Sequence, residues 1–372
     1  MSERIDRIEV HYLQIPLTKP YRLSFGPVEH YDTIVVELID SAGHYGFGEA
    51  TLLTGYTDET IAESWALAKQ LASELAGLPL ATFTERLEAL VARAPFAATA
   101  FLTAQDMLSQ HPLLSPAEPV RVPILGLLQG KDEAELRDDF ARLTENGYKT
   151  VKVKVGFDVP ADLANLSLMQ QVVDGRAAIR VDANQGYSAA QAEAFIRDVD
   201  PCGIELFEQP CAAGDWDAQR RAAAAAATTG LALMLDESIY GLADIERAAK
   251  ERACIYLKVK LMKFGSIDAL TSAIERIRAL GMRPVLGNGV ASDVSCWMEA
   301  CVAARHIDNA GEMNGYLKAR SSLFEQPLRF EQGHIVLDAA LRPALNRDAL
   351  AAHMCDRVAY RKELHACDPT LS

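Results

Sequence analysis

The chain has 372 residues, of which 49 % are hydrophobic and 24 % charged, and its formal net charge is −14. This length suits either two to three domains or one barrel with an additional unit. The acidic net charge argues against nucleic acid or anionic membranes as partners. No apolar run approaches the roughly 20 residues of a membrane span, and no secretory segment is recognisable. Seven cysteines without a C-x-x-C pair indicate free thiols, so we expect a cytoplasmic protein.

The first part of the chain predicts an α+β unit. Apolar and polar residues alternate as in strands over residues 4–13, 33–39 and 44–49. Helical spacing of apolar residues follows at 60–75, 81–93 and 97–110. The C-terminal tail shows a strand pair within 328–337 and a helical stretch at 349–363, which we expect to pack back on this unit.

Beyond the prolines at positions 112, 116 and 119, strands and helices alternate. The predicted strands lie at 120–127, 150–155, 179–181, 203–207, 232–235, 255–259, 283–286 and 309–312. Eight strands about 25–30 residues apart, with helices between them, fit a (β/α)8-type (modified TIM) barrel. A doubly wound dinucleotide-binding sheet would need a complete glycine fingerprint, which neither 46–48 nor 287–289 provides.

Charged residues stand where several of these strands end. Lys152 and Lys154 alternate with valines, so they share one face of their strand. Asp182, Glu208 and Asp236 end the next three strands. Each acid alone is well explained as a helix N-cap, but three in succession near two inward lysines favour a bound cation. An all-oxygen ligand set suits Mg²⁺, with Mn²⁺ as an alternative.

This order of residues resembles the enolase superfamily, and within it the muconate lactonizing enzyme-like subgroup. The matching phrases are Lys152-Val153-Lys154-Val155-Gly156, Val181-Asp182-Ala183-Asn184, Phe207-Glu208-Gln209-Pro210, Leu235-Asp236-Glu237-Ser238 and Lys260-Leu261-Met262-Lys263-Phe264-Gly265. The resemblance covers nearly the whole chain. It implies an N-terminal capping domain at 1–118, a catalytic barrel at 119–323 and a C-terminal segment, 324–372, that completes the cap.

The resemblance also implies roles for individual residues. Asp182, Glu208 and Asp236 would bind Mg²⁺, and Lys154 and Lys260 would act as acid and base on opposite faces of the substrate. Lys152 would hold the substrate carboxylate and depress the pKa of Lys154, while Lys258 and Lys263 are the near alternatives to Lys260. Asn184 and Glu237 would support the ligands. Substrate contacts are expected from Glu312, Asn314, Asn288, Tyr21, Ser24 and Tyr56, the last three in loops covering the barrel mouth.

Some positions depart from the family pattern. No histidine follows the seventh strand, and Lys258 stands where relatives often have asparagine. Glu312-Met313-Asn314 replaces the Asp-x-Asp that receives the substrate ammonium group in dipeptide epimerases; a solvated loop acid is the alternative reading of Glu312.

The expected chemistry is removal of the proton α to a carboxylate, which needs a metal and cations where negative charge develops. We expect racemisation or epimerisation of an amino-acid-type substrate by a homo-oligomeric enzyme whose partner is a small-molecule carboxylate. The alternatives are a dehydratase of a β-hydroxy acid or amino acid such as 3-hydroxyproline, and a cycloisomerase or o-succinylbenzoate synthase. Two alternatives lie outside the family: an aldolase that forms a Schiff base through a barrel lysine, and a barrel without catalytic activity.

Overall fold

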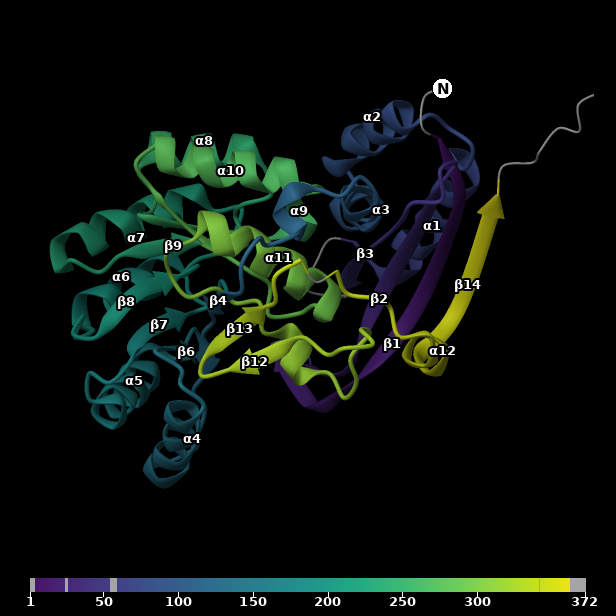
Figure 1. The fold of residues 1–372 in the computed structure, drawn as a ribbon. Helices are drawn as coiled ribbons and strands as arrows, with labels where there is room; N and C mark the ends of the chain where they lie inside the picture. The colour runs from purple at the N-terminus through teal and green to yellow at the C-terminus, as the bar shows by residue number, and fades with distance from the viewer. Residues whose placement is uncertain (1–3, 24–25, 54–58, 341, 362–372) are drawn as a thin grey trace, which may run out of the picture.

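An antiparallel sheet forms one side of the molecule, and a parallel sheet surrounded by helices forms the other (Figure 1). The computed structural model describes residues 4–23, 26–53, 59–340 and 342–361. Among the helices in these ranges, none has the length and apolar character needed to cross a membrane.

The antiparallel sheet has the strand order β14–β1–β2–β3. Its strands are β1 (Ile5–Leu23), β2 (Gly26–Asp40), β3 (Tyr45–Leu52) and β14 (Met354–Arg361). Alternate residues such as Ile8, Val10 and Val36 form a core with the helices on one face, which are α1 (Ile61–Leu75), α2 (Leu80–Val91) and α3 (Pro95–Leu108). β3 lies so close to α3 that a Cβ atom at Gly46 or Gly48 would stand 2.2 Å from an α3 atom. These two glycines therefore serve close packing.

The predicted helix at 349–363 is wrong over most of its length. Helix α12 (Arg347–His353) ends where β14 begins, and β14 pairs antiparallel with β1, placing Val358 opposite Val10 and Tyr360 opposite Ile8. Val358 and Tyr360 pack against the core between the sheet and its helices. The edge of β1 offers unpaired backbone groups, and satisfying them outweighs the local helical preference of this segment.

The parallel sheet confirms the predicted α/β class. Its order is β11–β10–β9–β8–β7–β6–β5. The strands are β5 (Gly126–Leu127), β6 (Thr150–Lys154), β7 (Ala178–Asp182), β8 (Ile204–Glu208), β9 (Leu233–Leu235), β10 (Tyr256–Val259) and β11 (Arg283–Leu286). The connecting helices are α4 (Glu133–Glu145), α5 (Val159–Val173), α6 (Ala189–Asp198), α7 (Trp216–Thr229), α8 (Leu242–Glu251), α9 (Leu261–Phe264), α10 (Ile267–Ala279) and α11 (Asp293–His306).

Hydrogen bonds through Gly311 and Glu312 link the two edges of this sheet. The Glu312 N–H donates to the carbonyl oxygen of Leu286 on β11 at 3.0 Å, and the Leu125 N–H donates to that of Gly311 at 2.9 Å. The predicted strand at 309–312 is thus reduced to a bridge between Gly311 and Ile124.

The predicted strand at 120–127 is divided between two sheets. Its first part, β4 (Val120–Pro123), pairs with β13 (His334–Leu337), which pairs with β12 (Arg329–Glu331). Two short 3-10 helices, η1 (Pro112–Leu114) and η2 (Gly315–Lys318), complete the regular elements of the described residues. The tail therefore contacts both β4 and, through β14, the antiparallel sheet; the predicted domain boundaries stay a prediction.

Strand alternation stacks the inward side chains of the parallel sheet in layers. Leu206, Met234, Tyr256 and Val285 form a small buried apolar cluster. The residues two positions further along three of these strands are Glu208, Asp236 and Lys258. Because side chains two residues apart point to the same face, the charged residues lie as a second layer toward the carboxyl ends of the strands.

Candidate active site

A cavity at the carboxyl ends of the parallel strands brings together most of the predicted site residues. Its lining residues are Leu53, Lys152, Lys154, Asn184, Asp236, Lys258, Lys260, Asn288, Gly289, Val290 and Glu312. Asp182 and Glu208 are almost fully buried and form ion pairs with lysines of this lining. Catalytic sites of parallel α/β barrels lie at this edge of the sheet.

The three predicted metal ligands share ammonium groups in neighbouring pairs. Asp182 and Glu208 are neighbours in register on β7 and β8. Lys152 Nζ lies 2.7 Å from Asp182 Oδ2 and 2.9 Å from Glu208 Oε2. Lys258 Nζ lies 3.0 Å from Glu208 Oε1 and 3.6 Å from Asp236 Oδ2. Each neighbouring pair of carboxylates therefore faces one common cation.

The two predicted acid–base lysines reach the cavity from well-separated strands. Lys154 ends β6, and its Nζ lies 2.6 Å from Asp182 Oδ2. Lys260 follows β10, and its Nζ lies 2.8 Å from Asp236 Oδ2. Strands β7, β8 and β9 separate β6 from β10. Both lysines therefore line the cavity from strands that are not neighbours in the sheet, and their placement on opposite faces of a substrate stays a prediction.

Burial and opposite charge set the protonation of this cluster. Burial alone would lower the pKa of Lys152, but Asp182, Glu208 and Glu312 raise it well above its ordinary value. Burial alone would raise the pKa of Asp236, but Lys260, Lys258 and Lys263 hold it well below its ordinary value. Lys152 is therefore a fixed cation suited to holding an anion. Its predicted effect on the pKa of Lys154 stays a prediction.

Asn184 and Glu237, the predicted supporting residues, are connected to each other and to the lysine on β6. Asn184 Nδ2 donates to Glu237 Oε1 at 3.1 Å, and the Asn184 N–H donates to Asp182 Oδ1 at 2.8 Å. Asn184 Oδ1 also accepts a short hydrogen bond from Lys154 Nζ. These bonds fix both the lysine and the carboxylate that it contacts.

Lys263, one of the alternatives to Lys260, has a different position. Its Nζ donates to the carbonyl oxygens of Asp236 at 2.9 Å and Ile239 at 3.0 Å, and it lies 4.3 Å from the ring centroid of Tyr240. Burial lowers the pKa of Lys263 to about 8. Lys263 is absent from the cavity lining and holds the turn after β9, whereas Lys258 and Lys260 both line the cavity.

Two further residues position the site although the sequence assigned them no role. Gln209 Oε1 accepts from the N–H groups of Asp236 at 2.9 Å and Ser238 at 3.2 Å. Glu299, buried in α11, accepts from the N–H groups of Leu261 at 2.9 Å and Asn288 at 3.1 Å. The sequence signal for Glu299 is an acid in the middle of α11, between the apolar residues Met298 and Ala300.

The predicted substrate-binding residues divide into three groups. Asn288 and Glu312 line the cavity. Asn314 is buried outside the lining, where its Nδ2 donates to the carbonyl oxygen of Leu125 at 3.1 Å. The side chain of Tyr21 and the whole of Ser24 and Tyr56 lie outside the described residues, so their roles stay predictions.

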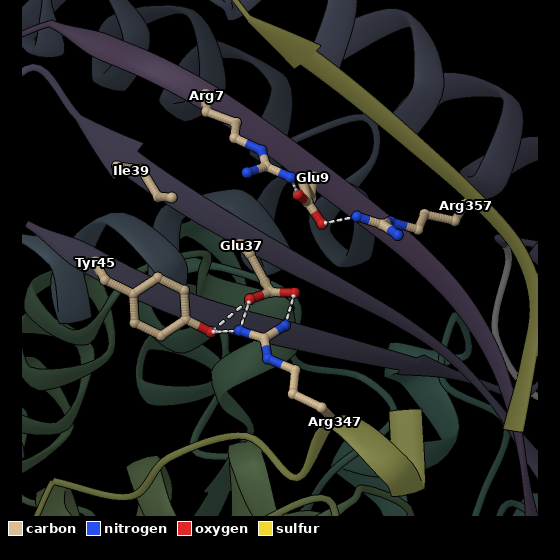
Figure 2. A pocket seen from close by; sticks show the side chains of 7 residues that line it. All are labelled: Arg7, Glu9, Glu37, Ile39, Tyr45, Arg347 and Arg357. Atoms are coloured by element: carbon tan, nitrogen blue, oxygen red, sulfur yellow. Dashed lines mark hydrogen bonds and ion pairs between the residues drawn. The ribbon is translucent and has the colours of Figure 1, made fainter. Parts of the chain in front are cut away.

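A second group of potential metal ligands lies on the antiparallel sheet. Glu9, His11 and Glu37 bring their ligand atoms within 4.8 Å of one another. Figure 2 shows that arginines already occupy these carboxylates: Arg357 donates to Glu9 at 2.6 Å, and Arg347 donates to both oxygens of Glu37 at 2.6 Å. A cation would have to displace these arginines, so the group is an ion-pair network.

The sequence comparisons point to one family. A family model described as enolase C-terminal domain-like matches residues 135–342. The chain is 30 % identical over 333 residues to an L-Lys-D/L-Arg epimerase from Methylococcus capsulatus, covering 84 % of this chain and 91 % of that protein. It is 25 % identical to an N-succinyl-L-Arg/Lys racemase from Bacillus cereus, covering 85 % of this chain and 88 % of that protein.

Solved structures share the fold. The N-succinyl Arg/Lys racemase from Bacillus cereus matches with a TM-score of 0.86 and 24 % identity, covering 96 % of this chain and 100 % of that one. A dipeptide epimerase from Cytophaga hutchinsonii, crystallised with Mg and the dipeptide D-Ala-L-Val, matches with a TM-score of 0.84 and 20 % identity over the same shares of the two chains.

Proposed function

This chain belongs to the enolase C-terminal domain-like family, and from this membership we propose that it racemises or epimerises an amino-acid-type carboxylate. The family prediction is confirmed, and the epimerases and racemases among its relatives make it an enzyme of the isomerase class. The observation that carries the specific proposal is one cavity lined by Lys154 and Lys260 from separate strands.

The two lysines would exchange the α-proton from opposite sides of the substrate. One lysine, as the neutral amine, removes the proton from the carbon next to the carboxylate; the other, as the ammonium ion, returns a proton to the opposite face. This exchange inverts the configuration at that carbon, and each direction of reaction uses the same pair in reversed roles. The buried cation Lys152 would hold the substrate carboxylate in place between them.

The carboxylates of Asp182, Glu208 and Asp236 fit a hard divalent cation. They are buried, offer only oxygen ligands, and already gather around shared cationic nitrogens. We propose that they hold Mg²⁺, with Mn²⁺ as the alternative. When bound, such an ion would supply positive charge that stabilises the negative charge developing on the substrate as the proton leaves. The Cytophaga relative was crystallised with Mg.

We also propose that the parallel sheet is a closed (β/α)8-type barrel with a cap built from both chain termini. The hydrogen bonds through Gly311 and Glu312 support closure, and the pairing of β14 with β1 supports a cap of mixed origin. Leu53, which follows β3, lines the cavity, so the N-terminal unit contributes to the site.

Hydrogen exchange at the α-carbon tests the function directly. Each enantiomer of a panel of amino acids and their N-acyl and dipeptide derivatives is incubated in D₂O with Mg²⁺. Wild-type protein should incorporate α-deuterium into both enantiomers and lose this activity in EDTA. Lys154→Ala and Lys260→Ala should each stop net racemisation, while each variant still exchanges the proton of one enantiomer. The exposed Lys149→Ala is the matched control.

Other outcomes separate the alternatives. If both lysine variants exchange both enantiomers at the wild-type rate, the two-base mechanism is wrong. Release of water from a β-hydroxy substrate would identify a dehydratase. Activity that survives EDTA, with a lysine trapped by borohydride, would identify a Schiff-base enzyme.

A further inference from the structure

Glu312 lines the cavity, but its charge is already neutralised by lysines of the same chain. Its Oε2 lies 3.0 Å from Lys152 Nζ and also accepts a short hydrogen bond from Lys258 Nζ. Lys258 is 2 % exposed and makes its second contact, at 3.0 Å, with Glu208. The Lys258 side chain therefore holds Glu312 and cannot turn to solvent.

The lysines of the lining around this pair are themselves matched by carboxylates. Four lysines line the cavity, and they form ion pairs with the carboxylates of Asp182, Glu208, Asp236 and Glu312. A further ammonium group, that of Lys318, donates to the carbonyl oxygen of the lining residue Gly289 at 2.5 Å. An incoming ammonium group would lose its hydration without gaining an unpaired carboxylate from Glu312, because two lysines already contact that side chain.

We propose that Lys258 is a specificity-determining residue that withholds Glu312 from the substrate. The site then accepts amino acids whose nitrogen bears a neutral or negative acyl group, and excludes substrates that carry an ammonium group near the reacting carbon. This proposal rests on the proposed function, since it names the substrate class of that same cavity. It replaces the predicted ammonium contact of Glu312 with an internal ion pair.

A pair of matched substrates isolates the effect of a substrate ammonium group on kcat/KM. An N-propionyl amino acid and the corresponding alanyl dipeptide differ only by an ammonium group in place of one hydrogen. Wild-type protein should show a kcat/KM at least about 10-fold higher for the N-propionyl compound, since an unpaired charge in the cavity forfeits its hydration.

Lys258→Met should shift the ratio of kcat/KM toward the dipeptide by about 10- to 100-fold, the range expected for a charge-assisted hydrogen bond made available to the substrate. The double variant Lys258→Met/Glu312→Gln should lose this shift, because the gain depends on the freed carboxylate. An unchanged ratio in Lys258→Met, or a shift that persists in the double variant, overturns the proposal.

Calorimetric binding of N-propionylglycine and alanylglycine in the presence of Mg²⁺ gives the same comparison without turnover. If no compound exchanges its α-proton, the proposed function fails, while the ratio of dissociation constants still tests the role of Lys258. Should Lys258→Met not fold, Glu312→Gln serves as the second variant; it removes the negative partner and should weaken alanylglycine binding further relative to N-propionylglycine. A Glu312→Gln protein that favours alanylglycine contradicts the proposal.

Discussion

Glu49 couples the antiparallel sheet to the parallel one, and its charge should oppose stability at neutral pH. It lies on β3 with no exposed surface. Its Oε1 accepts from the N–H groups of Ser292 at 3.0 Å and Ser295 at 3.1 Å, where α11 begins, and its Oε2 accepts from the Ser292 hydroxyl. Burial raises the pKa of Glu49 to about 7, although the hydrogen bonds from the two serines lower it in part.

The magnitude follows from the difference between folded and unfolded protein. A pKa of about 7 in the folded state against the ordinary 4.5 corresponds to roughly 3 kcal/mol. Because the folded state binds this proton more tightly, the free energy of unfolding should fall as the pH rises from about 4.5 to about 7, and then level off. Glu49→Gln keeps the shape and most hydrogen bonds but cannot ionise, so it should escape this loss.

Urea unfolding at pH 5, 6, 7 and 8 compares wild-type protein with Glu49→Gln. Relative to wild type, the variant should gain roughly 2.5 kcal/mol in free energy of unfolding between pH 5 and pH 8, because part of the full effect is already present at pH 5. Glu145→Gln, an exposed substitution at the end of α4, is the control and should follow the wild-type curve. Parallel curves for wild type and Glu49→Gln would refute the reasoning.

Two further predictions concern folding. Burial would raise the pKa of Glu37, but hydrogen bonds from His11, Arg347 and Tyr45 hold it at about 2. Glu37→Gln should therefore lower the urea midpoint at pH 7, and the difference in midpoint from wild type should shrink as the pH falls from about 4.5 toward about 2. A difference that stays constant with pH would contradict this prediction. Gly156 has φ +98°, and an added Cβ would stand 2.3 Å from the Ala183 carbonyl oxygen. The control position, Gly175, has φ +66° and open space around an added Cβ, so Gly156→Ala should have a much lower melting temperature than Gly175→Ala. Equal losses in the two variants would show that backbone strain alone matters.

The sequence alone was sufficient to place the ligand and lysine positions on their strands. Alternation with period two sets Lys152 and Lys154 on one face of β6, and Asp182, Glu208 and Asp236 each end or follow a strand of the parallel sheet. Parallel strands present their carboxyl ends at one edge, so residues at those ends must gather there whatever the details of packing. This local geometry is why most of the candidate site could be predicted.

Only the tertiary structure decided which charged groups form ion pairs with one another and which lie outside the cavity lining. Lys258, Lys260 and Lys263 are alike in sequence, yet Lys258 pairs with Glu312 while Lys263 holds a turn outside the cavity lining. The pairing of β14 with β1 likewise overrode a local helical pattern. Both outcomes depend on contacts between segments far apart in the chain. The spacing of apolar residues and the intrinsic propensities predict only the type of a local element and which of its faces is buried. Which groups meet depends on how the sheet brings strands together, because buried backbone groups and buried charges must each find a partner.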